Sequence, residues 1–70
     1  MSDNENGVKI RILDKEFRIS CPEESEQALY NAASYLDKQM RQIRHSGRVI
    51  GIERIAVMAA LNIANELLAL

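Results

Sequence analysis

The sequence predicts an α+β fold, in which a β-hairpin is followed by two α-helices and the chain dimerises through the C-terminal helix. Apolar and polar residues alternate between residues 8 and 21, as in strands with one buried face. Apolar residues then recur at spacings of three and four between residues 23 and 44, as in an amphipathic helix. The last stretch, from residue 52, is apolar on nearly all sides, which indicates a helix that is covered on more than one flank.

The 70 residues form one small domain at most. Residues 1–7 are polar and acidic and are predicted to be a disordered tail. Residues 8–51 are expected to form the hairpin and the first helix of a head. Residues 52–70 are expected to form the second helix and the dimer interface.

The hairpin is predicted from "VKIRIL" and "FRISC", which flank "DKE". A two-residue turn at Asp14-Lys15 gives a register that matches apolar residues on one face: Ile12 with Phe17, Ile10 with Ile19, and Val8 with Cys21. The same register sets Arg11 directly across from Arg18. Because like charges in that position are destabilising, we expect an anionic partner, or an acidic residue from elsewhere in the dimer, to relieve them.

The first helix is expected to begin with Pro22 at its first position, where the missing N–H costs nothing, and to end before Gly47. Acidic residues in its first turns and basic residues near its end complement the helix dipole. Its apolar face is predicted to comprise Leu29, Ala32, Ala33, Leu36, Met40 and Ile43.

The final helix raises the question of what covers it. Between Ile55 and Leu70 the polar residues are Asn62, Asn65 and Glu66. One hairpin and one helix cover a single flank of this helix. Leaving the other flank exposed to water loses about 1.5–3 kcal/mol of burial free energy for each large apolar side chain. We therefore predict a homodimer. Its interface is expected to contain Ile55, Val57, Leu61 and Leu68.

The composition supports a dimer and argues against an enzyme. Chains below about 70–80 residues usually need disulfides, a metal or a partner to be stable. A single cysteine, Cys21, excludes a disulfide within the chain, and with His45 it falls short of four zinc ligands. We expect no catalytic residues, no metal site and no cofactor. The lone thiol and the absence of a signal or membrane-spanning pattern favour the cytoplasm.

Several stretches together resemble the ZapA family of bacterial cell-division proteins, which bind the tubulin-like protein FtsZ. They are a Cys-Pro pair at a strand-to-helix junction, "AASYLDKQMRQIR", "SGRVIG" and "ERIAVMAALNIANELL", and the likeness covers residues 8–68. The resemblance implies a dimeric head that binds FtsZ, promotes filament association and Z-ring assembly, and acts in the cytoplasm at the division site. It also implies that residues 52–70 contain the start of a truncated coiled coil, and it implies a tetramer only where a longer coiled-coil tail follows.

The resemblance also implies a set of partner-binding residues: Lys15, Arg18, Arg44, Arg48, Glu53 and Met58. From the residues alone, the basic side chains near the end of the first helix are better explained as a solvated face that compensates the helix dipole, and the resemblance brings partner binding by Arg44 and Arg48 level with that explanation. Both interpretations stay open at this point.

The alternative function is a small dimeric DNA-binding repressor of the ribbon-helix-helix type. Lys9, Arg11 and Arg18 share one face of the predicted hairpin, and such repressors read DNA with strand residues. One observation argues against the repressor. The ribbon of a ribbon-helix-helix repressor takes one strand from each subunit, whereas this chain has two predicted strands in succession. An affinity for duplex DNA that falls steeply with salt would identify the repressor. Co-sedimentation with polymerised FtsZ would identify the division protein. Our prediction includes no nucleic acid and no membrane among the partners.

Overall fold

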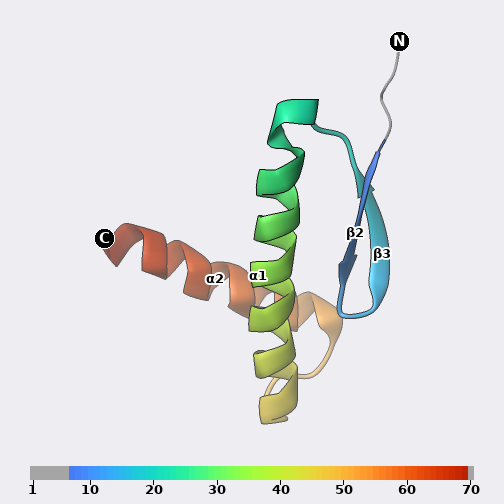
Figure 1. The fold of residues 1–70 in the computed structure, drawn as a ribbon. Helices are drawn as coiled ribbons and strands as arrows, with labels where there is room; N and C mark the ends of the chain where they lie inside the picture. The colour runs from blue at the N-terminus through green and yellow to red at the C-terminus, as the bar shows by residue number, and fades with distance from the viewer. Residues whose placement is uncertain (1–6, 70) are drawn as a thin grey trace. The chain divides into compact units, whose positions relative to one another are not determined.

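The computed structural model describes residues 7–69, so residues 1–6 of the predicted tail lie outside it. The elements, in order, are strands β2 (Val8–Ile12) and β3 (Lys15–Ile19), a 3-10 turn (Glu23–Ser25), and helices α1 (Glu26–Ser46) and α2 (Ile52–Ala69) (Figure 1). The predicted α+β order of a hairpin and two helices is confirmed. The chain divides into two compact units, one ending at Asp37 and the other beginning at Lys38, within α1.

The two strands pair antiparallel, with Val8 opposite Ile19 and Ile12 opposite Lys15. The turn is therefore Leu13-Asp14, and the predicted turn one residue later is wrong. Both turn residues have positive φ, 49° and 69°, as in a type I′ turn. Leucine rarely adopts this conformation. Here the Leu13 N–H donates a hydrogen bond to Asp37 Oδ1 at 2.7 Å, and Leu13 is only 7% exposed. The hydrogen bond and the burial of the residue together offset the strain.

The corrected register changes which charges meet across the hairpin. Arg11 lies opposite Glu16, not Arg18, and its Nη1 is 4.0 Å from Glu16 Oε1. Lys9 Nζ lies 3.7 Å from Glu16 Oε2, although Lys9 is itself opposite Arg18. The expected pair of like charges thus exists, but it consists of Lys9 and Arg18. Pairing shifted by two positions leaves the apolar face intact, with Ile10 now opposite Phe17.

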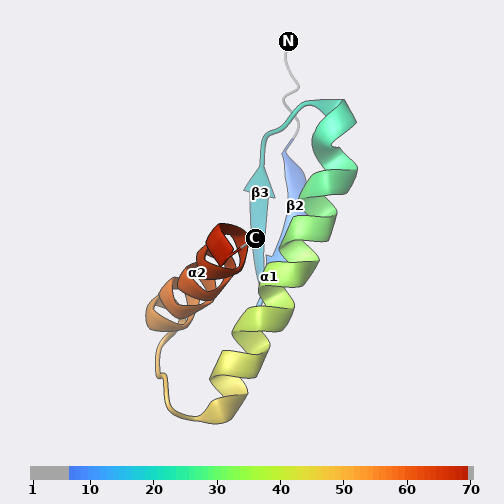
Figure 2. The same ribbon diagram turned by 90° about the vertical axis from the view of Figure 1, so that its left-hand side faces the viewer.

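The first unit buries one strand more deeply than the other. Val8 and Ile12 of β2 are each 6% exposed, and Ala33 of α1 is 9% exposed. The hairpin lies along the N-terminal part of α1 (Figure 2). By contrast, all five residues of β3 are exposed. Both strands come from one chain, unlike the ribbon of a ribbon-helix-helix repressor.

Helix α1 begins and ends close to its predicted limits. Pro22 is extended, with ψ 149°, and its carbonyl accepts the Ser25 N–H at 2.9 Å, so it precedes the first turn instead of opening it. At the other end, Gly47 follows Ser46 with φ 75°, a conformation that suits glycine. Of the predicted apolar positions, two are buried, three are half-buried and one is exposed: Ala33 and Met40; Leu29, Leu36 and Ile43; and Ala32.

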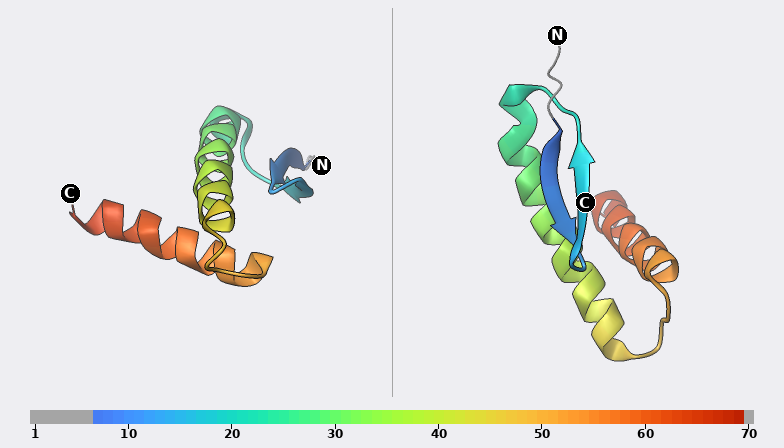
Figure 3. Two further views of the ribbon diagram at one scale, coloured as in Figure 1. Left: turned by 90° about the horizontal axis from the view of Figure 1, so that it is seen from below. Right: turned by 90° about the vertical axis from the view of Figure 1, so that its right-hand side faces the viewer.

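The connection to α2 is short (Figure 3), and local hydrogen bonds hold both of its ends. The Ser46 hydroxyl donates to the Ile43 carbonyl at 2.6 Å and accepts the Arg48 N–H at 3.2 Å. Gly51, with φ 98°, precedes α2, and its carbonyl accepts the Ile55 N–H at 3.0 Å. The predicted helix start near residue 52 is confirmed.

Helix α2 has a buried stripe and an exposed apolar stripe. Ile55 and Ala59, four residues apart, are 3% and 0% exposed. Leu61 and Leu68 are 59% and 84% exposed, although both are large and apolar. Among the described residues, neither helix combines the length and apolarity required to cross a membrane.

Candidate partner-binding surface

Two of the predicted partner-binding residues belong to β3. Lys15 and Arg18 are exposed, and they lie three positions apart on one continuous strand. Side chains alternate between the faces of a strand, so these two point to opposite faces. Lys15 shares its face with Phe17 and Ile19, while Arg18 shares its face with Glu16. The strand therefore does not present Lys15 and Arg18 as one basic patch.

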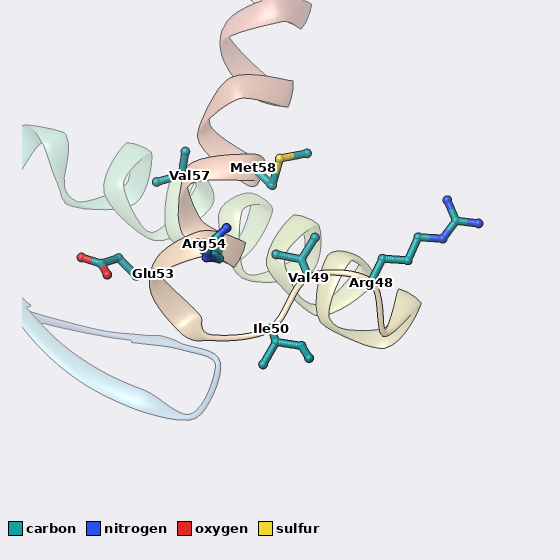
Figure 4. A pocket seen from close by; sticks show the side chains of 7 residues that line it. All are labelled: Arg48, Val49, Ile50, Glu53, Arg54, Val57 and Met58. Atoms are coloured by element: carbon teal, nitrogen blue, oxygen red, sulfur yellow. The ribbon is translucent and has the colours of Figure 1, made fainter.

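The second unit has an open hollow of about 700 Å³ where the inter-helix connection meets the first turns of α2 (Figure 4). Its lining residues are Arg48, Val49, Ile50, Glu53, Arg54, Val57 and Met58. A second hollow, of about 540 Å³, shares Arg48, Val49 and Met58 with the first. It extends onto the last turns of α1 and toward Asn62. The two hollows therefore adjoin at these three shared residues.

Local structure positions the charged groups at this hollow. The Ser46 hydroxyl holds the Arg48 backbone N–H at 3.2 Å, immediately after α1 ends. The Arg48 side chain extends away from the connection, on the side of Met58, whereas Glu53 extends on the other side (Figure 4). Glu53 lies in the first turn of α2, where its negative charge complements the helix dipole. The hollow thus combines separated charges of both signs with apolar lining.

The structure brings together three predicted partner-binding residues on this hollow: Arg48, Glu53 and Met58. Arg44 lies in the last turn of α1 and lines neither hollow. Sequence reasoning missed Arg54, Val49 and Ile50. Ile50 lies in the short connection between Gly47 and Gly51 and is 82% exposed.

The predicted dimer residues separate into two groups. Ile55 is buried within the chain at 3% exposure, so little of it remains for a second copy. Val57, Leu61 and Leu68 are 55%, 59% and 84% exposed. With Ala64, which is also exposed, they follow spacings of four, three and four, the seam pattern of a coiled coil. These side chains form the exposed stripe of α2.

A hairpin, two helices, a mixed charged and apolar hollow and an exposed heptad-like stripe together define a small α+β module with open apolar and charged surface. The family model described as "Cell division protein ZapA" matches residues 8–70. The chain belongs to the ZapA family.

Individual relatives support this membership. A "Cell division protein ZapA" from Pseudomonas aeruginosa is 56% identical over 63 residues, which are 90% of this chain and 61% of the relative. One from Pectobacterium atrosepticum is 35% identical over 60 residues, covering 86% of this chain and 55% of the relative. The chain thus spans less than two thirds of the length of these relatives.

A solved structure shows the same fold. It is described as "Unknown conserved bacterial protein from Pseudomonas aeruginosa PAO1" and is 55% identical, with a TM-score of 0.86. The match covers 91% of this chain and 70% of that one. The hairpin and two helices are therefore shared with this solved protein.

Proposed function

We propose that this chain is a non-enzymatic cell-division regulator that binds FtsZ, promotes filament association and contributes to Z-ring assembly in the cytoplasm at the division site. Membership of the ZapA family supports the cell-division role. The observation that carries the proposal is that Arg48, Glu53 and Met58, each expected to bind the partner, line one open hollow.

The chemistry of this hollow suits a folded protein surface. Ile50, Val57 and Met58 are 82%, 55% and 40% exposed, so the hollow offers apolar area for burial. Arg48 and Arg54 supply donors for carboxylates, and Glu53 supplies an acceptor at a different point. Apolar area at the centre of an interface supplies affinity, and complementary charges around it supply orientation. Arg44 contributes a further positive charge from the end of α1.

Charge reversal at Arg48 tests the proposal. Arg48→Glu should weaken co-sedimentation with polymerised FtsZ by roughly tenfold or more, because an interfacial charge pair becomes a repulsion. Lys38→Glu makes the same change of charge at an exposed α1 position outside both hollows, and it should co-sediment like the parent. Circular dichroism and light scattering check that both variants keep their fold and subunit count. Equal co-sedimentation of the two variants would exclude Arg48 from the FtsZ surface.

We further propose that two copies associate through the exposed stripe of α2. The support is the exposure of Val57, Leu61 and Leu68 together with their heptad-like spacing. Packing this stripe against its equivalent in a second copy removes large apolar side chains from water. A tetramer is proposed only for chains with a longer coiled-coil tail.

A further inference from the structure

Within the described residues of the first unit, strand β3 pairs along one edge only. In the described part of the chain, the sheet has two strands, and β3 pairs with β2 alone. All five residues of β3 are exposed, including Phe17 at 43% and Ile19 at 39%. An uncovered strand edge carries unpaired N–H and C=O groups and is a template for another strand.

The turn determines which backbone groups face that edge. In a type I′ turn the carbonyl of the first residue, Ile12, faces the N–H of the fourth, Lys15. Groups that face the partner strand alternate along an antiparallel ladder, so those of Lys15, Phe17 and Ile19 are directed to β2. The N–H and C=O groups of Glu16 and Arg18 are therefore directed to the free edge.

The sequence of β3, "KEFRI", is complementary to itself when it runs antiparallel. In a register centred on Phe17, each Glu16 lies opposite Arg18 of the second copy, and the two Phe17 side chains meet at the two-fold axis. The Glu16 and Arg18 backbone groups are the ones that face outward, so this register also satisfies the alternation of the ladder. Backbone geometry and side-chain charge thus select the same register.

This register also supplies a missing counter-charge. Arg18 lies opposite Lys9 across the hairpin. The ion pairs of the hairpin join Glu16 to Lys9 and Arg11, and within the residues that the structure describes Arg18 joins no ion pair. Pairing with a second β3 places a carboxylate on the open side of each Arg18. Opposite charges across a strand pair are stabilising.

We propose that β3 is a self-association edge, at which two copies pair antiparallel about Phe17 to form a continuous four-stranded sheet. This contact goes beyond the association of α2 stripes and uses different residues. It assigns Arg18 to the contact between copies and not to the FtsZ surface, to which the family resemblance assigned it. Lys15 remains at the turn end of the strand, opposite Ile19 of the second copy.

Disulfide trapping tests the register. In a Cys21→Ser background, Phe17→Cys places two thiols at a pair without mutual hydrogen bonds, where Cα atoms are about 4.5 Å apart and a disulfide can form. Lys15→Cys is the matched control on the same face, because the two Lys15 positions are offset by roughly 13 Å along the strands. On mild oxidation, Phe17→Cys should give a covalent dimer on non-reducing gels well before Lys15→Cys. Equal rates, or no covalent dimer from Phe17→Cys, would overturn the proposal.

Charge exchange provides an independent test in the Phe17→Cys background. In a homodimer of Glu16→Arg, position 16 of each copy is an arginine opposite Arg18 of the other copy. In a homodimer of Arg18→Glu, position 18 of each copy is a glutamate opposite Glu16 of the other. Each variant therefore has two like-charge pairs and should form its disulfide more slowly than the parent. Mixing the two, with one chain tagged for size, restores both opposite-charge pairs. The mixed dimer should then form faster than either homodimer and exceed the half expected of random pairing.

The outcomes separate this contact from the other proposals. Association through α2 alone predicts equal trapping at positions 17 and 15 and random mixing of the charge variants, and that result would overturn the β3 contact while leaving the α2 stripe intact. Loss of FtsZ co-sedimentation by Arg18→Glu, with unchanged trapping at Phe17→Cys, would return Arg18 to the FtsZ surface and equally overturn the proposal.

Discussion

The two units of the chain treat their large apolar residues differently. In the first unit, Leu13 at the hairpin turn is 7% exposed, and the turn is held by the bond to Asp37 at 2.7 Å. In the second unit, Leu61 and Leu68 remain 59% and 84% exposed on a regular helix. The hairpin turn is thus stabilised by contacts within its own chain. The exposed face of α2 keeps its apolar surface in contact with solvent in the single chain, which is why we propose that a second copy covers it.

The units also reverse the chain by different means. The hairpin turn uses Leu13 and Asp14, which take positive φ against their preference, whereas the inter-helix connection uses Gly47 and Gly51. A side chain added at either glycine meets nothing within 4 Å. The first reversal therefore depends on tertiary contacts, and the second on local backbone freedom. The following variants test this contrast, beginning with the largest expected effect.

Leu61→Glu should disrupt the association of α2 stripes. Each copy loses about 1.5–3 kcal/mol of apolar burial, and both copies change in a dimer, so the dimer dissociation constant should rise by at least roughly 100-fold. Light scattering and sedimentation at several concentrations measure this change. The proposal predicts that the variant becomes an unfolded or aggregating monomer, because the freed stripe has no other cover.

Asn65→Glu is the control for that variant. It adds the same charge to an exposed α2 position outside the stripe formed by Val57, Leu61 and Leu68. It should keep the subunit count of the parent. A compact, well-folded monomer of the unsubstituted protein at micromolar concentration, or a Leu61→Glu variant that keeps the dissociation constant of the parent, would contradict the α2 interface.

Asp37→Ala should weaken the first unit by removing the acceptor of the Leu13 N–H. Leaving that part-buried donor unpaired costs about 1–3 kcal/mol, which urea unfolding at fixed protein concentration can measure. Asp37→Asn keeps an amide oxygen as acceptor and should lose clearly less. If Asp37→Asn loses as much free energy of unfolding as Asp37→Ala, the negative charge of Asp37 matters and its role as a hydrogen-bond acceptor does not.

Element order was predictable from the sequence because each element has a strong local signal. The spacing of Leu29, Ala33, Leu36 and Met40 defines α1, and Gly47 marks its end. The hairpin register was not predictable, because the usual rules assign the turn to small or polar residues and not to leucine. Leu13 takes its unusual φ of 49° by virtue of its bond to Asp37, 24 residues away, and this contact has no local signal.

The partner surface was predictable only in part. Arg48, Glu53 and Met58 were selected by family resemblance, and the connection between the helices brings them to one hollow. The sequence does not tell which of Ile55 and Val57 is buried within the chain, since both are apolar residues on an almost uniformly apolar helix. The packing of the folded chain is needed to decide this. Exposed fractions of 3% for Ile55 and 55% for Val57 distinguish them, and composition does not.

The smallest expected effect tests the local reversal of the second unit. Gly47→Ala forces a Cβ onto a residue with φ 75°, which costs about 1 kcal/mol or slightly more, and no neighbouring atom adds a clash. Gly47→Asn should cost less, because asparagine tolerates this conformation. Urea unfolding of both variants at one protein concentration measures the difference. If alanine and asparagine cost the same, the helix end is not limited by its backbone conformation, and the second reversal would depend on tertiary contacts as the hairpin turn does.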